Sequence, residues 1–148
     1  MEMKIEGLTG LMKKLEYLGG NSTQAIDKGI GKAAEKIKAD AKRLCPHDTS
    51  ALKGRISSER LAPMKWAVGT NIEYSPCVEF GTGSLGDPSV PHTAKKFWRY
   101  KKNGRYYTTH GQRPQPFLYP ALINNKDCVF NYAKAELRKA LRGKMNGD

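Results

Sequence analysis

The chain has 148 residues, enough for one domain with a buried core, and its shares of 39% apolar and 27% charged residues indicate a soluble globular protein. Its formal net charge of +12 attracts polyanions or acidic protein surfaces. Three cysteines without a CxxC pair disfavour a disulfide framework and favour a reducing compartment, and no apolar run is long enough for a secretory signal or a membrane-spanning helix.

The first third of the chain is predicted to be mainly helical. Residues 1–7 alternate weakly and predict a short strand, and residues 8–18 place apolar side chains at helical spacing before two glycines. The clearest helix runs from Thr23 to Leu44. It should end there because Pro46 cannot continue a helix. Its apolar stripe consists of Ile26, Ile30, Ala33, Ile37, Ala41 and Leu44.

Extended structure is predicted next. Residues 47–53 predict a turn followed by a short helical turn, and residues 55–61 and 65–70 predict two strands joined around a proline. The segment 74–80 is ambiguous, although Pro76 near its start suits the first turn of a helix.

Residues 81–115 predict an extended arm within the single domain of residues 1–148, because they are rich in glycine, proline and basic residues. Asn103-Gly104 lies between two aromatic-rich runs and predicts the turn of a β-hairpin. This hairpin would suit DNA, an acidic protein neighbour or the wall of a channel that conducts DNA. Its basic residues are Lys95, Lys96, Arg99, Lys101, Lys102 and Arg105.

A last helix is predicted from Pro120 to Arg142. It should bend or restart at residues 124–127, which have poor helix propensity. Its apolar face consists of Leu122, Val129, Ala133, Leu137, Ala140 and Leu141.

The candidate catalytic and cofactor motifs are incomplete. Cys45, His47 and Asp48 bring a thiol, an imidazole and a carboxylate together, but a nucleophile also needs an oxyanion hole and a substrate cleft. Residues 81–86 spell GxGxxG, yet prolines follow where a dinucleotide loop would open a helix. We therefore expect no enzyme, no cofactor and no metal site. The residues considered as metal ligands are Cys45, His47, Cys77, His92, His110 and Cys128.

Three stretches occur in a characteristic order. They are AKRLCPHDTSALKGRIS at residues 41–57, VGTNIEYSPCVEFGTG at residues 68–83 and QPFLYPAL at residues 115–122. In this order they resemble the small tail-component family of lambda-like long-tailed bacteriophages, which make neck or tail-completion proteins. Ser50 and Ser75 stand where the family's pattern has glycine and alanine.

The resemblance covers residues 21–141 and implies an α+β fold. Two or three helices would pack on one antiparallel sheet, and an extended loop would carry the basic hairpin. It also implies a non-enzymatic virion protein of a phage or prophage, assembled in the host cytoplasm as a ring, expected to be a hexamer, at the head–tail junction or tail end. Its partners would be further copies of itself, the connector or stopper, and tail-terminator or tail-tube proteins, with DNA passing through the lumen. The competing interpretation is a cytosolic DNA-binding protein that uses the basic hairpin.

The arm is predicted to be anchored at its two ends. At the first end, Phe80 is expected to pack on the core and Gly81 to let the backbone turn outward. At the second end, Phe117 is expected to be buried while the neighbouring prolines set the chain direction. The full set of anchoring and interface residues is Glu79, Phe80, Gly81, Thr82, Gln115, Pro116 and Phe117.

Overall fold

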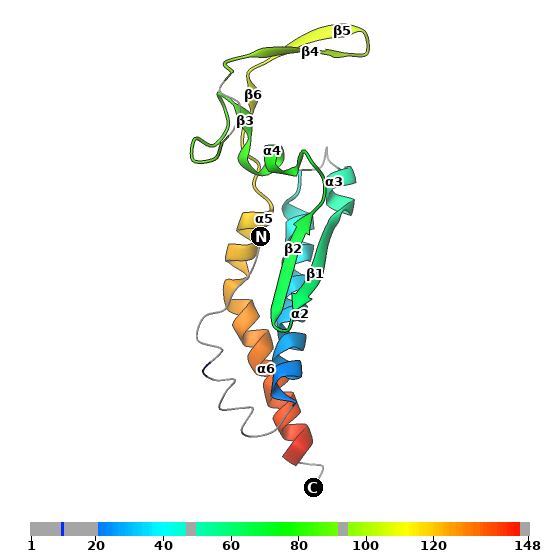
Figure 1. The fold of residues 1–148 in the computed structure, drawn as a ribbon, viewed down its shortest axis with the longest axis vertical. Helices are drawn as coiled ribbons and strands as arrows, with labels where there is room; N and C mark the ends of the chain where they lie inside the picture. The colour runs from blue at the N-terminus through cyan, green and yellow to red at the C-terminus, as the bar shows by residue number, and fades with distance from the viewer. Residues whose placement is uncertain (1–9, 11–20, 47–49, 92–94, 146–148) are drawn as a thin grey trace.

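A computed structural model describes residues 10, 21–46, 50–91 and 95–145. An elongated body and a projecting arm make up this part of the chain (Figure 1). The body consists of two long helices and a β-hairpin, and the arm leaves it at one end (Figure 1). The predicted strand at 1–7, nearly all of the predicted helix at 8–18, and most of the turn before residue 50 lie outside the described residues.

Helix α2 (Ser22–Leu44) is the centre of the body and confirms the predicted helix. Its predicted apolar stripe is buried except for Leu44 at the helix end, which is 39% exposed. Cys45 follows as a C-cap residue whose backbone N–H donates to the Ala41 carbonyl. The hairpin and helix α6 pack against different sides of α2, which therefore contributes to both layers of the body (Figure 1). The buried residues of α2 are Ser22, Ile26, Gly29, Ile30, Gly31, Ala33, Ala34, Ile37 and Ala41.

The hairpin confirms the two predicted strands. Helix α3 (Ser50–Gly54) leads into β1 (Ile56–Ala62), which pairs antiparallel with β2 (Lys65–Thr70). Ile56 and Val68 are buried against α2, so alternate residues of each strand face the helix and the others face outward. The hairpin thus covers one side of α2. The outer face of the hairpin itself is not covered by the described residues.

Asp27 of α2 fixes the turn of this hairpin. Its carboxylate accepts hydrogen bonds from the Arg60 Nε–H at 2.7 Å, the Met64 backbone N–H at 3.0 Å and the Trp66 indole N–H at 3.0 Å. Met64 has a positive φ of 60°, an uncommon conformation that these bonds help to hold. Burial raises the pKa of Asp27, but the bonds from Trp66, Met64 and Arg60 together outweigh it and leave that pKa below its ordinary value.

We expect Asp27→Asn to lower stability at neutral pH by about 2 kcal/mol, because the ionised acceptor of several bonds is lost. With its pKa lowered by folding, Asp27 contributes stability that is fully present above its ordinary pKa of 3.8 and is lost as pH falls through the lower folded value. Urea unfolding of both proteins from neutral pH to below pH 4 checks this prediction. The stability difference should shrink only in the acidic range, and a difference independent of pH would contradict the role of the charge.

The last helix is broken, as its polar segment predicts. Helix α5 (Leu118–Asn124) is followed by its C-cap residue Asn125, and α6 (Lys126–Met145) begins directly after that residue. The buried Asn125 side-chain amide donates to the Ala121 carbonyl at 2.8 Å and to Asp40 of α2 at 2.6 Å. The break therefore has a packing role, since it ties the α5–α6 junction to α2. The hydrogen bond from Asn125 is the main cause that lowers the pKa of Asp40.

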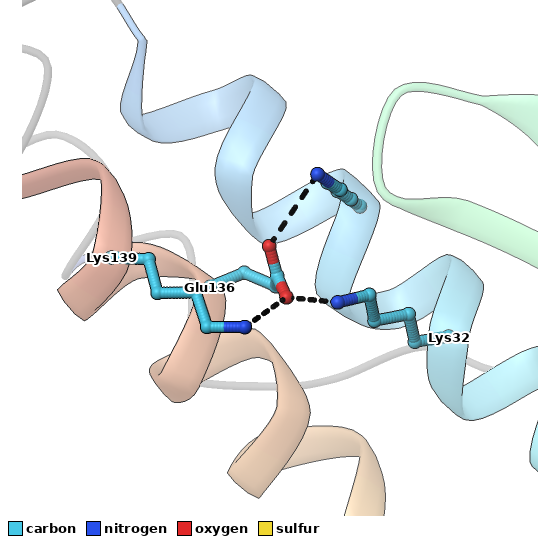
Figure 2. Close-up of polar contacts among 4 residues, drawn as sticks. Lys32, Glu136 and Lys139 are labelled. Carbon is cyan, nitrogen blue, oxygen red and sulfur yellow. Dashed lines mark hydrogen bonds and ion pairs between the residues drawn. The ribbon is translucent and has the colours of Figure 1, made fainter. Parts of the chain in front are cut away.

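Helices α2 and α6 approach closely at Gly29. A Cβ atom at this position would lie 2.5 Å from the Ala133 Cα and 2.7 Å from the Tyr132 carbonyl oxygen, so only glycine fits. Beside this contact, Glu136 of α6 is buried to 6% exposure and faces lysines of α2 and α6. Figure 2 shows Lys32 and Lys139 converging on its carboxylate, and the hydrogen bond from Lys32 is the main cause that holds the pKa of Glu136 below its ordinary value.

We expect Gly29→Ala to destabilise the protein by about 2 kcal/mol, because the overlap with the α6 backbone exceeds the gain in helix propensity. Gly143→Ala is the matched control, since Gly143 lies in α6 with nothing within 4 Å of an added Cβ atom. That change should be neutral or slightly stabilising in urea unfolding. Equal effects of the two substitutions would show that propensity, and not the close helix contact, sets the result.

The described elements form an α+β fold, as predicted. The β-structure does not form one continuous sheet, because it consists of three separate two-stranded antiparallel pairs in the described residues. The β1–β2 pair packs on α2. In the arm, β3 (Thr82–Gly83) pairs with β6 (Gly111–Gln112), and β4 (Trp98–Lys102) pairs with β5 (Arg105–Thr109). The predicted hairpin around Asn103-Gly104 is confirmed, with both residues at positive φ.

Candidate functional site

The arm is attached to the body where its two ends come together. Helix α4 (Ser75–Phe80), with its early proline, leads into the arm, and the chain returns through β6 toward α5. The outgoing and returning segments pair through β3 and β6, with Thr82 opposite Gln112 and Gly83 opposite Gly111. The Gln115 backbone N–H also donates to the Val78 carbonyl at 2.8 Å. We call this meeting of α4, β3, β6 and the start of α5 the arm junction.

Glu79 holds the arm junction together. Its side chain is 5% exposed and accepts the backbone N–H groups of Phe117, Leu118 and Tyr119 at 2.9, 3.0 and 2.9 Å. These donors belong to the start of α5, where the first turn of a helix has no partners of its own. A carboxylate is also favoured there by the helix dipole. Glu79 therefore caps a helix that begins 38 or more residues later in the chain.

The structure corrects part of the predicted anchor set. Phe80 was expected to pack on the core, but it is 37% exposed, and Val78 at 5% takes the core position. The reason is that residues 75–80 form a helix, in which Val78 and Glu79 face inward and Phe80 lies beyond that face. Phe117 is completely buried, as expected, whereas Gln115 and Pro116 are exposed.

Gly81 turns the chain out of α4, as predicted. It has φ 73° and ψ −175°, a combination that is accessible essentially only to glycine. A Cβ atom there would lie 2.5 Å from the Gln112 carbonyl oxygen and 2.8 Å from the Pro114 nitrogen. The two ends of the arm therefore contact each other backbone to backbone. Thr82 adds a further link, since its hydroxyl oxygen accepts the Gln112 backbone N–H at 3.1 Å.

Strands β4 and β5 form a two-stranded ribbon that extends beyond the body (Figure 1). Five residues in each strand give it a length of about 17 Å. At its base, Trp98 lies against Gly83, where a Cβ atom would be 2.9 Å from the indole ring. From Arg99 to Thr108 every ribbon residue is exposed, so the described chain covers neither face.

The two faces of the ribbon differ in chemistry. On one face, the rings of Tyr100 and Tyr107 stack at 5.7 Å, and Lys102 pairs with Arg105 toward the tip. On the other face, Lys101 lies over the ring of Tyr106 at 5.6 Å. The whole arm, residues 81–115, has seven basic residues and one acidic residue in its sequence. The predicted basic residues of the ribbon are thus exposed together, although no described contact shows what they bind.

A second uncovered surface lies on the body. The outer face of β1–β2 lines an open hollow of about 580 Å³ that includes Ser57, Glu59, Ala67 and Gly69. A neighbouring hollow of about 540 Å³ continues from the end of β2 across α4 and is lined by Glu73 and Phe80 among others. Gly69, Thr70 and Asn71 line both hollows, which therefore form one continuous surface. Sequence reasoning did not identify this surface, although the alternation in β1 and β2 indicates which residues face outward.

The three cysteines belong to three different helices or helix ends in the described part of the chain. Cys45 is buried at the end of α2, Cys77 is exposed on α4 and Cys128 is half-buried on α6, while His47 and Asp48 lie outside the described residues. Within residues 10, 21–46, 50–91 and 95–145, no group of three or more His, Cys, Asp and Glu side chains could hold a metal ion. His92, another predicted metal-ligand candidate, is also outside them.

The GxGxxG match has a structure of its own. Residues 81–86 run through the short strand β3 into a turn in which the Gly86 N–H donates to the Gly83 carbonyl, so they do not open a helix.

In the part of the chain that the structure describes, no helix is long and apolar enough to cross a membrane.

The sequence and the fold were compared with those of known proteins. The chain matches no protein-family model, no curated protein and no solved structure. The resemblance to phage tail components therefore stays a prediction from the sequence.

Proposed function

We propose that the protein is a structural component of a long-tailed phage or prophage virion, which forms a ring at the head–tail junction or the tail end. The observation that carries this proposal is the arm junction. Two of the three sequence stretches with the family's pattern, ending at Gly83 and beginning at Gln115, meet there through Glu79 and the start of α5. The motif residues thus serve to fix the base of a projecting arm.

The exposed surfaces also favour a protein that assembles. Monomeric proteins rarely expose large contiguous apolar patches, yet the stacked Tyr100 and Tyr107 are 45% and 43% exposed on one face of the ribbon, and Tyr106 is 68% exposed on the other. Isolated two-stranded ribbons are only marginally stable in water, so a partner is expected to cover this one. Neighbouring copies in a ring, the connector or stopper, and the tail-terminator or tail-tube protein are the proposed partners.

Removing the gene from the phage or prophage tests the proposal. Electron microscopy of lysates should show separate heads and tails, or incomplete tail ends, and wild-type protein supplied from a plasmid should restore complete particles. Immunogold labelling of those particles should place the protein at the neck or tail end. Normal, infectious particles without the protein would overturn the proposal.

A DNA-binding protein is the second candidate, because the ribbon exposes both positive charge and aromatic rings. Gel-shift titration with duplex and single-stranded DNA at several salt concentrations tests it directly. A DNA-binding function requires affinity at physiological salt that falls steeply as salt rises and is lost when Lys101 and Lys102 are changed to glutamate. The same double change should leave the fold intact, since both side chains are exposed.

A further inference from the structure

We infer that the ribbon of one copy docks on the outer face of the β1–β2 hairpin of a neighbouring copy. This inference rests on the proposed ring, and it names the two surfaces that would join its subunits. Neither hollow along β1–β2 and α4 is lined by a ribbon residue of the same chain. The ribbon extends beyond the body, while the hairpin lies alongside α2 (Figure 1).

The receiving surface is the outer face of β1–β2 with the two open hollows along it. Ser57 lies opposite Gly69, and Glu59 lies opposite Ala67, so three small residues and one carboxylate occupy the centre of the outer face. A Cβ atom on Gly69 would meet no atom within 4 Å, which shows that nothing in the described chain covers this point. The small side chains of this open hollow leave room for the stacked rings of Tyr100 and Tyr107.

Charge on the receiving surface supports the same occupant. Among the described acidic residues, most carboxylates are already engaged in hydrogen bonds or ion pairs; these are Asp27, Glu35, Asp40, Glu79, Asp87 and Glu136. Glu59 and Glu73 have no such partner in the described structure, and each lines one of the two hollows. Acidic side chains are scarce on a chain of net charge +12, and two of those without a partner in the described structure line this surface.

The ribbon presents the complementary chemistry on one face. Lys102 and Arg105 are paired at its tip on the same side as the Tyr100–Tyr107 stack, because alternate residues of a strand share a face. That face can bury two tyrosine rings on the small-residue surface and bring two cations to Glu59 and Glu73. Docking would also stabilise the ribbon, which has few contacts with its own body.

This contact joins two different surfaces of the chain and is therefore heterologous. Contacts of this type produce a ring when the rotation between subunits closes, and a filament when it does not. The inferred docking thus provides a route to the proposed ring that a symmetric two-fold contact would not provide.

Disulfide trapping between two variants tests the contact. In a background with Cys77→Ser and Cys128→Ser, which leaves only the buried Cys45, one preparation has Lys102→Cys and the other has Glu59→Cys. Mild oxidation of the mixture should give a cross-linked dimer that neither preparation gives alone. The matched control replaces Glu59→Cys by Asp127→Cys, another exposed acidic position on the distant helix α6. We expect about tenfold more dimer than in this control, because docking raises the effective concentration of the two thiols.

Charge reversal separates docking from a purely structural effect. Glu59→Arg with Glu73→Arg should abolish ring formation, as should Lys102→Glu with Arg105→Glu, in sedimentation and electron microscopy of full-length protein and in assembled particles. A mixture of the two double variants should recover assembly, because both contacts between unlike variants pair opposite charges. The unchanged ribbon of one variant meets the unchanged hairpin of the other, and the reversed ribbon meets the reversed hairpin.

The outcomes separate this inference from the proposed function. No cross-linking above the control overturns the inference, and so do rings that persist in both charge-reversed variants, although the ring itself would then stand. Loss of DNA affinity in the Lys102→Glu, Arg105→Glu variant without any cross-link would assign the ribbon to DNA and also overturn the inference. Particles that assemble normally without the protein would instead overturn the proposed function.

Discussion

Glu79→Ala should destabilise the protein by about 3 kcal/mol, because it leaves three helix N-terminal donors without their charged acceptor in a buried position. Water cannot easily replace the carboxylate, since Phe117 beside it is completely buried. The loss also releases the start of α5 from α4, so the base of the arm should loosen. Urea unfolding measures the first effect, and hydrogen exchange of the amides of residues 117–119 measures the second.

Two control substitutions test whether the Glu79 carboxylate causes the loss of stability. Glu73→Ala removes an exposed carboxylate of the same region that has no hydrogen-bond partner in the described structure, and it should change stability by less than about 0.5 kcal/mol. Glu79→Gln keeps the size of the side chain but offers one acceptor oxygen, and its amide donors face other donors. It should therefore behave more like alanine than like glutamate. Unchanged exchange at residues 117–119 in Glu79→Ala would show that the capping role is wrong.

Gly81→Val should have an effect of similar or greater size, about 3–4 kcal/mol, because two independent costs act together. The backbone conformation at this position is essentially restricted to glycine, and the added Cβ atom would lie 2.5 Å from the Gln112 carbonyl oxygen. The chain can relieve the overlap only by separating β3 from β6. We therefore expect lost protection of the amide of Gln112 in hydrogen exchange, together with lower thermal stability.

Gly54→Val is the matched control for this substitution. Gly54 ends α3, and nothing lies within 4 Å of a Cβ atom added there. It should cost much less than Gly81→Val in thermal unfolding. If Gly81→Val kept full stability and full protection at Gln112, the close approach of the two arm segments would have to be absent in solution.

The sequence predicted the long helix and both hairpins well because periodicity and turn chemistry are local signals. The stripe of α2, the strands of the β1–β2 hairpin and the Asn103-Gly104 turn each follow from residues within one element. The break between α5 and α6 also follows locally, because residues 124–127 have low helix propensity. The outer face of β1–β2 could have been found in the same way, by continuing the alternation of the strands.

The arm junction could be located from the sequence but not explained. Glu79 and the start of α5 are 38 to 40 residues apart, and no local pattern indicates which carboxylate will cap which helix. Phe80 was misplaced for a related reason, since hydrophobic character alone does not show which side of a one-turn helix meets the core. The division of the β-structure into three separate pairs likewise depends on how the arm leaves the body.

The pairing of Thr82 with Gln112 and of Gly83 with Gly111 has a consequence for how the chain can be altered. An insertion whose two ends are adjacent can change in length or sequence without moving the segments that flank it. Residues 84–110 satisfy this condition, because their ends meet at the β3–β6 pair. The segment between Gly83 and Gly111 can therefore be replaced by a short turn without moving the flanking segments of the body.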